Sequence, residues 1–451
     1  MKKEAYGMTA GDMTEGRILP GLWRYAVPLI LGSCFQLAYN AVDAIIVGRF
    51  IGKGALAAEG IASPVMNLVI LGISGVCIGA GVLMSEFFGA KAYDRLKREM
   101  STAVLFGLLL SVLVAVAGIV FTQPLLDCLH APENVRDMTA VYLRITFFGA
   151  PFTCFYNALA AALKSIGDSS TPLKFLLFSS ILNGVLDLLL IGSLGFGIVC
   201  SAVTTVAAQA VSAGLCAIYI FRRIPLLHLR REEWRIDGGL LRTTLRYGSI
   251  TALQQSVQPI CKLLIQEQVN LLGLDAVAAF HACTRVDDFA FTPEQSISHA
   301  ITTFVAQNRG AKKPERIRRG FRAGLALELM YWICIAAVTL LFRRNIMGLF
   351  VAGDGSGTVI NLGSGYLQWM ALFYLWPALT NGMQGFYRGV GKMGMTLFGT
   401  IIQTSVRVLV TYLLAPVMGI SGIAVACVVG WTAMLCVQIP YYFWYLRSAN
   451  K

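Results

Sequence analysis

One apolar stretch of the sequence, residues 172–192, carries two polar side chains whose spacing suits cation binding. The stretch is long enough to cross a bilayer, which takes about 20 mostly apolar residues. It nevertheless contains Asn183 and Asp187, and an ionisable side chain inside a spanning helix costs at least ~2.5 kcal/mol on insertion scales. Residues four apart lie on one helix face. Asn183 and Asp187 therefore present an amide oxygen and a carboxylate together, which is the chemistry of a proton or alkali-cation site.

Two carboxylates in the predicted spans of the N-terminal half have alternative interpretations. Asp187 can instead form a structural ion pair with Arg144, and Asp43 can lie near a membrane interface, where a carboxylate costs little. If both face one desolvated pocket, burial and mutual repulsion favour a bound proton. Other polar residues in the spans are candidates for lining a water-filled cavity. They are Asn40, Glu267, Arg285, Asp287 and Asp288.

One predicted span of the C-terminal half, residues 275–307, is unusually polar and is expected to line water. Arg285 lies in this span, two residues before Asp287 and three before Asp288. Either carboxylate is an ion-pair partner for Arg285 inside the protein. Substrate contact is the alternative, and the sequence favours neither.

The composition places these residues in a polytopic membrane protein. Of 451 residues, 56% are hydrophobic and 14% are charged, whereas soluble domains contain about 25% charged residues. The four histidines and eleven cysteines show neither HExxH nor CxxC spacing, so we expect no metal site of those types and no disulfide framework. The net charge of +13 would suit nucleic acid only as a basic face on a soluble domain.

The apolar runs predict twelve spans, and the basic residues predict their orientation. The odd-numbered loops hold only Arg49, Lys53, Arg136, Arg343 and Arg344 of the 37 Lys and Arg residues. By the positive-inside rule, we expect a protein of a bacterial-type cell (inner) membrane with both termini on the cytoplasmic side. The same distribution of basic residues explains the net charge without nucleic acid. The predicted spans are residues 20–48, 56–88, 100–122, 138–163, 171–192, 197–222, 241–270, 275–307, 320–342, 363–387, 393–414 and 419–446.

The two halves of the chain repeat each other at a shift of 221 to 224 residues. Gly-Ala-Lys at 89–91 recurs at 310–312, and Gly-Ile at 197–198 recurs at 419–420. An even number of spans per repeat gives both halves the same orientation, related by a pseudo-two-fold axis along the membrane normal. The expected fold is therefore all-α, with twelve transmembrane helices in two six-helix lobes. The predicted parts are an N-terminal lobe, residues 1–222, a cytoplasmic linker, 223–240, and a C-terminal lobe, 241–451.

The repeat also predicts where the cation site is not duplicated. Arg407 stands where the N-terminal half has the region of Asn183, and Leu264 or Ile265 stands opposite Asp43. An arginine and an aliphatic side chain cannot bind a cation. We therefore expect the ion chemistry in the N-terminal lobe alone.

Four features of the sequence occur together: the two repeats, an Asp near the end of the first span, Asn-xxx-Asp in the fifth span and Ser-Ala-Val-Thr-Thr at 201–205. With them the chain resembles the multidrug and toxic compound extrusion (MATE) transporters over its whole length. In the branch whose ion site lies in the N-terminal lobe, a helix-one proline that matches Pro28 is a bending point. Another branch has acids in the seventh and tenth spans; Glu267 fits the seventh, but the tenth has no carboxylate here. The resemblance implies cation or proton binding by Asp43, Asn157, Asn183, Asp187 and Thr205, with Asp43, Asn183 and Asp187 as metal ligands if the ion is Na⁺.

The resemblance implies a secondary antiporter that exports organic, often cationic, compounds while Na⁺ or H⁺ enters, by rocking of the two lobes. No cofactor other than the coupling ion is implied, and the expected partners are small organic substrates and membrane lipids around a monomer. One alternative is a lipid-linked oligosaccharide flippase of the same superfamily, which has a cationic cavity. A membrane-embedded prenyl transferase is another, but it needs paired DDxxD motifs, and Asp287-Asp288 has no such partner.

Overall fold

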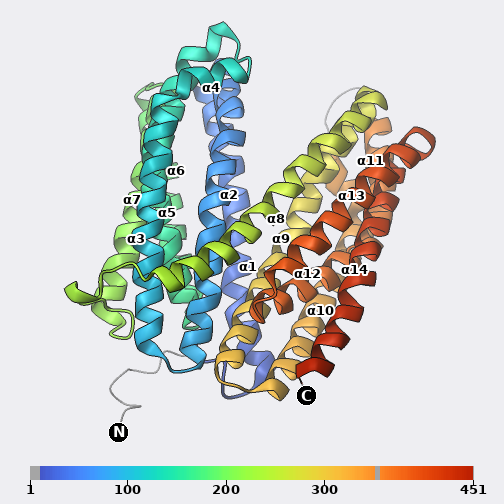
Figure 1. Ribbon diagram of the computed structural model, residues 1–451. Coiled ribbons are helices and arrows are strands. Elements are labelled where there is room, and N and C mark those ends of the chain that lie inside the picture. The colour runs from blue at the N-terminus through green and yellow to red at the C-terminus, as the bar shows by residue number, and fades with distance from the viewer. Residues whose placement is uncertain (1–10, 351–355, 450–451) are drawn as a thin grey trace. The chain divides into compact units, whose positions relative to one another are not determined.

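The computed structural model describes residues 11–350 and 356–449, without the side chains of residues 41, 43–45, 47–49, 53, 56, 356 and 449. This described part is helical and contains no strand (Figure 1). Its elements are α1 (Ile18–Phe50), α2 (Lys53–Gly89), α3 (Tyr93–Val120), α4 (Thr122–Cys128), α5 (Glu133–Ser165), α6 (Ser170–Asp187), η1 (Leu188–Ser193), α7 (Ile198–Arg223), η2 (Arg231–Glu233), α8 (Gly238–Leu271), α9 (Leu274–Gly310), α10 (Pro314–Phe350), α11 (Ser356–Phe373), α12 (Leu375–Gly389), α13 (Met393–Met418) and α14 (Ile420–Ala449).

Twelve long helical segments of the described chain match the twelve predicted spans. The tenth span is divided into α11 and α12 at Tyr374, and α6 continues into the π-helical turn η1. Nine of the described helices are long and apolar enough to cross a membrane by length and composition. The segments outside that set are α8, α9 and the divided α11 and α12, and α9 is the span that the sequence analysis found unusually polar.

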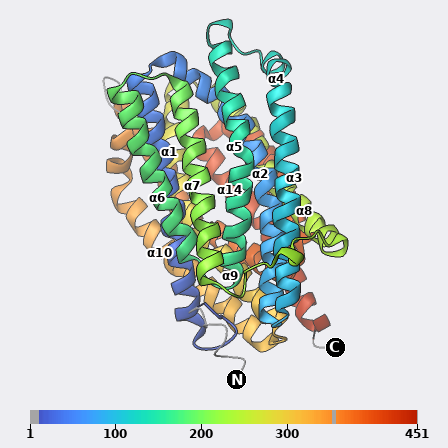
Figure 2. The ribbon, with the colours of Figure 1, turned by 90° about the vertical axis from the view of Figure 1, so that its left-hand side faces the viewer.

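The described chain forms two compact units, with boundaries within α1, α8 and α9 and directly before α1 and α10. The first unit consists of residues 11–16, 27–252 and 306–313. In it α5 packs against α2, α3 and α7, and α6 packs along α7 (Figure 2). Its core is apolar, and Met84 and Leu163 are among the fully buried side chains.

Small residues in the first unit let α2 approach the N-terminal part of α8 closely. A Cβ atom added at Gly75 would lie 2.7 Å from the Cβ atom of Ala252, and one at Gly79 would lie 2.8 Å from the backbone nitrogen of Gly248. Such contact between helix backbones is typical of Gly-xxx-Gly spacing in membrane proteins.

The second unit consists of residues 17–26, 253–305, 314–350 and 356–449. Its helix α10 packs against α11 and α12, while α13 and α14 form a pair and α14 also contacts α11. Aromatic and sulfur-containing side chains fill its core, among them Tyr366, Tyr374 and Cys427. The tyrosine hydroxyl groups bring polar atoms into this core, so buried acceptors are needed for them.

The sequence repeat has the same local structure in its two copies. Helices α2 and α9 each have 37 residues, and each is followed by a lysine, Lys91 or Lys312, with φ near +56°. The last glycines of the two helices pack reciprocally: a Cβ atom at Gly89 would lie 1.8 Å from the carbonyl oxygen of Gln307, and one at Gly310 would lie 1.9 Å from that of Glu86. Only glycine allows this approach.

Candidate ion and substrate site

The first unit contains an open cavity of about 550 Å³ among α1, α2, α5, α6 and α7. Its wall is formed largely by uncharged polar side chains and by small or aliphatic residues. Among the described residues that line it, Lys164 is the one charged side chain. The residues expected from the sequence that line this cavity are Pro28, Asn40, Asn157, Asn183 and Thr205.

Asn183 lies on α6 with its amide in the wall of this cavity. The residue is only 1% exposed, and neither its amide oxygen nor its amide nitrogen has a hydrogen-bond partner within the described part of the chain. A buried polar group without a partner costs about 1–3 kcal/mol. A cation or a polar ligand in the cavity would recover that free energy by binding the amide.

Asp187 lies one helical turn after Asn183 and is the last residue of α6 before η1. It is fully buried, and Thr204 of α7 places its hydroxyl oxygen 2.5 Å from Oδ1 of the carboxyl group. A hydroxyl that donates to a carboxylate makes a charge-assisted hydrogen bond, which is stronger than a neutral one. The π-helical turn that follows Asp187 belongs to a class of distortions frequently found at functional sites.

The Thr204 hydroxyl has a second set of acceptors close by. Its oxygen is 3.0 Å from the carbonyl oxygen of Cys200 and 2.9 Å from that of Ser201. A hydroxyl has one hydrogen to donate and lone pairs with which to accept. It can therefore donate to Asp187 when that group is ionised, or accept from Asp187 when it is protonated and donate to its own helix.

The structure separates the two adjacent threonines of α7. Thr205, the residue in the predicted site, lines the cavity, whereas Thr204 makes the contact with Asp187. Successive residues of an α-helix point about 100° apart, so both cannot face the same carboxyl group. The Thr-Thr pair was the available sequence signal for Thr204, but it does not say which hydroxyl faces α6.

Two further residues of the predicted ion site differ in what the structure says of them. Asn157 of α5 is half-buried and lines the cavity. The side chain of Asp43, in α1, lies outside the described residues. Its participation stays a prediction.

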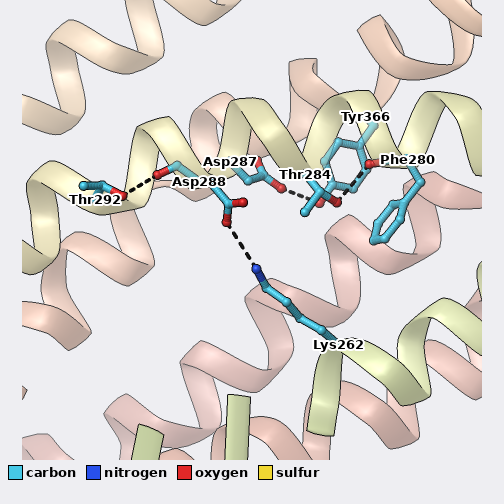
Figure 3. Close-up of polar contacts among 7 residues, drawn as sticks. All are labelled: Lys262, Phe280, Thr284, Asp287, Asp288, Thr292 and Tyr366. Carbon is cyan, nitrogen blue, oxygen red and sulfur yellow. Dashed lines mark hydrogen bonds and ion pairs between the residues drawn. The ribbon is translucent and has the colours of Figure 1, made fainter. Parts of the chain in front are cut away.

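The acidic pair predicted in the polar span α9, Asp287 and Asp288 (Figure 3), belongs to the second unit. Asp287 is buried and accepts hydrogen bonds from the hydroxyl groups of Tyr366, at 3.0 Å, and Tyr374, at 2.7 Å. Asp288 forms an ion pair with Lys262 of α8 at 3.2 Å. Their oxygens therefore have partners within this unit.

Two other candidates for cavity lining, Arg285 and Glu267, also lie in the second unit and are exposed. The hydroxyl of Tyr412 donates to Glu267 at 2.7 Å. Within the described part of the chain, Arg285 forms no ion pair with Asp287 or Asp288. None of the four candidates of this unit lines the cavity of the first unit.

The described residues offer no cluster of acids for a multivalent metal. No three His, Cys, Asp or Glu side chains among them are placed to hold one metal ion. The Asn183 and Asp187 pair instead supplies one carboxylate and one amide. Such a set has the charge to balance a proton or a single monovalent cation.

Comparison with protein families gives a match in each half of the chain. Residues 28–189 and residues 251–413 both match the MatE family model. The two matches begin 223 residues apart, in agreement with the shift of the sequence repeat.

Two relatives from Bacillus subtilis (strain 168) are similar over most of their length. The probable multidrug resistance protein YoeA is 30% identical over 350 residues, which cover 75% of this chain and 76% of that protein. The probable multidrug resistance protein YpnP is 27% identical over 438 residues, which cover 96% and 97% of the two chains.

Solved structures share the fold. A multidrug resistance MATE family transporter of the MOP superfamily, in an outward-facing conformation, superimposes with a TM-score of 0.92 at 21% identity over 98% of this chain and 99% of that one. A MOP superfamily transporter from Pyrococcus furiosus, in which reverse polarity of the binding pocket suggests a different function, gives 0.89 at 21% identity and the same coverage. The predicted all-α fold of two six-helix halves is thereby confirmed.

Proposed function

Because this chain belongs to the MATE family of transmembrane transporters, we propose that it is a secondary antiporter that exports small organic compounds while Na⁺ or H⁺ enters at Asp187. The predicted family is confirmed, and so is the prediction of a transporter rather than an enzyme. Several relatives are named for multidrug resistance or export, which supports organic compounds as the cargo.

One observation carries the proposal: a fully buried carboxyl group lies one turn from an amide of the cavity wall that has no hydrogen-bond partner among the described residues. Asp187 supplies charge for the ion, and Asn183 faces the space that a substrate would occupy. An ion at Asp187 and a substrate at Asn183 would act on the same turn of α6. Each would therefore alter the affinity for the other, and coupling requires that difference in affinity.

Thr204 supports a proton-dependent change at this turn. When Asp187 loses its proton, the hydroxyl donates to the carboxylate; when Asp187 gains one, the hydroxyl can return to the carbonyl oxygens of Cys200 and Ser201. Pro28, in the same cavity wall, cannot donate a backbone hydrogen bond, so α1 is able to bend there. In the proposed cycle the ion displaces the substrate and the two lobes rock between their outward-open and inward-open forms.

The cavity wall favours a second candidate for the cargo. Among its described lining residues are the ammonium group of Lys164 and no Asp or Glu, which suits an anionic compound better than a cation. A relative from Shewanella oneidensis, 24% identical over 77% of this chain, is named a FAD transporter. Anionic organic cargo, including the lipid-linked sugars of the flippase alternative, is therefore the second candidate.

The remaining parts of the proposal concern the cell. We propose that the protein lies in a bacterial-type inner membrane with both termini on the cytoplasmic side, because the basic residues concentrate in the termini and the even-numbered loops. The protein acts as a monomer in contact with membrane lipids. The N-terminal lobe, residues 1–222, alone contains the coupling site.

Efflux from lipid vesicles with sodium and pH gradients imposed separately tests the coupling site. Asp187→Asn keeps the side-chain volume and removes the charge, so it should abolish gradient-driven efflux while the protein still folds. Glu267→Gln removes an exposed carboxylate of the second unit and should reduce efflux less. Ethidium and FAD, compared as cargo, separate the cationic from the anionic candidate. Transport by Asp187→Asn at the wild-type rate would exclude Asp187 as the coupling residue.

A further inference from the structure

Two buried glutamates of the second unit, Glu294 on α9 and Glu328 on α10, lie on helices that pack together, since the hydroxyl of Tyr331 on α10 donates to the carbonyl oxygen of Ala290 on α9 at 3.0 Å. Both residues are 0% exposed. All four of their carboxyl oxygens are buried and make no hydrogen bond of normal geometry within the described part of the chain. The two carboxyl groups are close enough to interact electrostatically.

The groups around this pair do not neutralise it. The Asn381 amide, on α12, lies beside Glu294 and is uncharged, and the Tyr374 hydroxyl is close enough to interact electrostatically with Glu294. The buried cation of α12, Arg388, directs its guanidinium at 2.8 Å to the hydroxyl of Ser298, one turn along α9 from Glu294. Among the described residues, no Lys, Arg or His forms an ion pair with either glutamate.

Two adjacent carboxylates cannot both remain ionised under these conditions. Burial disfavours each charge, and the second charge repels the first. A single proton shared by the pair removes one charge and supplies a donor for one of the unpartnered oxygens. Carboxyl pairs of this kind titrate as a unit.

We infer that Glu294 and Glu328 form a proton-binding site in the second unit, separate from Asp187 of the first. Two carboxyl groups and one amide provide too few oxygen ligands for a hard divalent cation, which takes six or more. The carboxyl oxygens are buried away from the water that would complete the shell of any metal cation, so we assign the proton as the ligand. Loss of the proton would place two like charges between α9 and α10. The site therefore makes the packing of these two helices depend on pH, and this inference does not rest on the proposed coupling at Asp187.

Infrared spectroscopy of the full-length protein in lipid nanodiscs, across a pH series, tests the site. The wild type should show the carbonyl stretch of a protonated carboxylic acid at neutral pH, shifted in D₂O. The double variant Glu294→Gln, Glu328→Gln should lose that component of the spectrum. Each single variant should keep one carboxyl group that titrates in one step, at a different pH from the pair. Because Asp187 is present in all samples, its signal cancels in the difference spectra.

A matched control and a second measurement keep the test decisive. Glu315→Gln removes an exposed carboxylate that pairs with Arg318 at 3.1 Å, and it should leave the protonated-carboxyl signal unchanged. In the wild type, thermal stability should fall as the pH rises above the unfolded-state pKa of glutamate, about 4.3, because from there upward only the folded state retains the proton. Glutamine at both positions should remove that dependence. A neutral-pH spectrum in which the wild type and the double variant do not differ would overturn the inference, as would identical pH dependence of their stability.

Discussion

Replacement of Thr204 by valine should change the affinity of Asp187 for protons in a predictable direction. Valine has nearly the shape of threonine but lacks the hydroxyl, so the 2.5 Å contact with Oδ1 of Asp187 disappears. Without the hydroxyl, the ionised Asp187 loses a charge-assisted hydrogen bond, whereas the protonated Asp187 loses only a weaker bond between neutral groups. Proton binding at Asp187 is therefore favoured in the variant.

The size of the effect follows from the strength of that hydrogen bond. Hydrogen bonds to charged groups contribute about 1.5–3 kcal/mol, and about 1.4 kcal/mol corresponds to one pH unit. The midpoint of the Asp187-dependent transition should therefore move upward by about one to two pH units. The contact is fully buried, so water cannot readily take the place of the hydroxyl.

Ethidium binding to the purified protein in sodium-free buffer, measured against pH, gives the midpoint. The part of the pH dependence that Asp187→Asn removes is assigned to this site. Thr205→Val tests the neighbouring hydroxyl of the cavity wall and should shift the midpoint much less. Thr146→Val is the matched control, since among the described residues the Thr146 hydroxyl bonds to carbonyl oxygens of its own helix alone. An unchanged midpoint in Thr204→Val, or an equal shift in Thr205→Val, would refute the reasoning.

The remaining predictions concern packing and topology. Gly89→Ala would place a Cβ atom 1.8 Å from the carbonyl oxygen of Gln307, so it should lower the free energy of unfolding by about 1–3 kcal/mol and lower the Tm. The control Gly72→Ala adds a Cβ atom in open space on the same helix and should not lower the Tm. Equal Tm values for the two variants would contradict this prediction. In a variant without native cysteines, a cysteine at Glu315 should be shielded from an impermeant thiol reagent in intact cells and one at Leu274 should react, and the reverse result would overturn the topology.

The membrane class and the repeat were predictable because their signals are local. Apolar length and the distribution of Lys and Arg indicate spans and orientation without any knowledge of packing. Gly-Ala-Lys at 89–91 and 310–312 likewise marked equivalent helix ends. The Asn183 and Asp187 pair was also a local signal, since helical periodicity alone puts residues four apart on one face.

The partners of each polar group were decided only by tertiary structure. The choice of Thr204 over Thr205 for the contact with Asp187 depends on the rotation of α7 against α6. Asp287 takes its hydrogen bonds from Tyr366 and Tyr374, which follow it by 79 and 87 residues. No local pattern specifies such pairings.

The pair of Glu294 and Glu328 shows most clearly what the sequence determines and what only the tertiary structure decides. The sequence places each glutamate in a predicted span, where either alone would be interpreted as a cavity-lining or ion-paired residue. Their adjacency arises from the packing of α9 and α10, and among the described residues no basic side chain forms an ion pair with either of them. The sequence thus determined which charges are costly in the membrane, because that cost depends on residue type and span. The fold alone decided which of them share a proton, a hydroxyl or a cation, because electrostatic interactions depend on distances between helices.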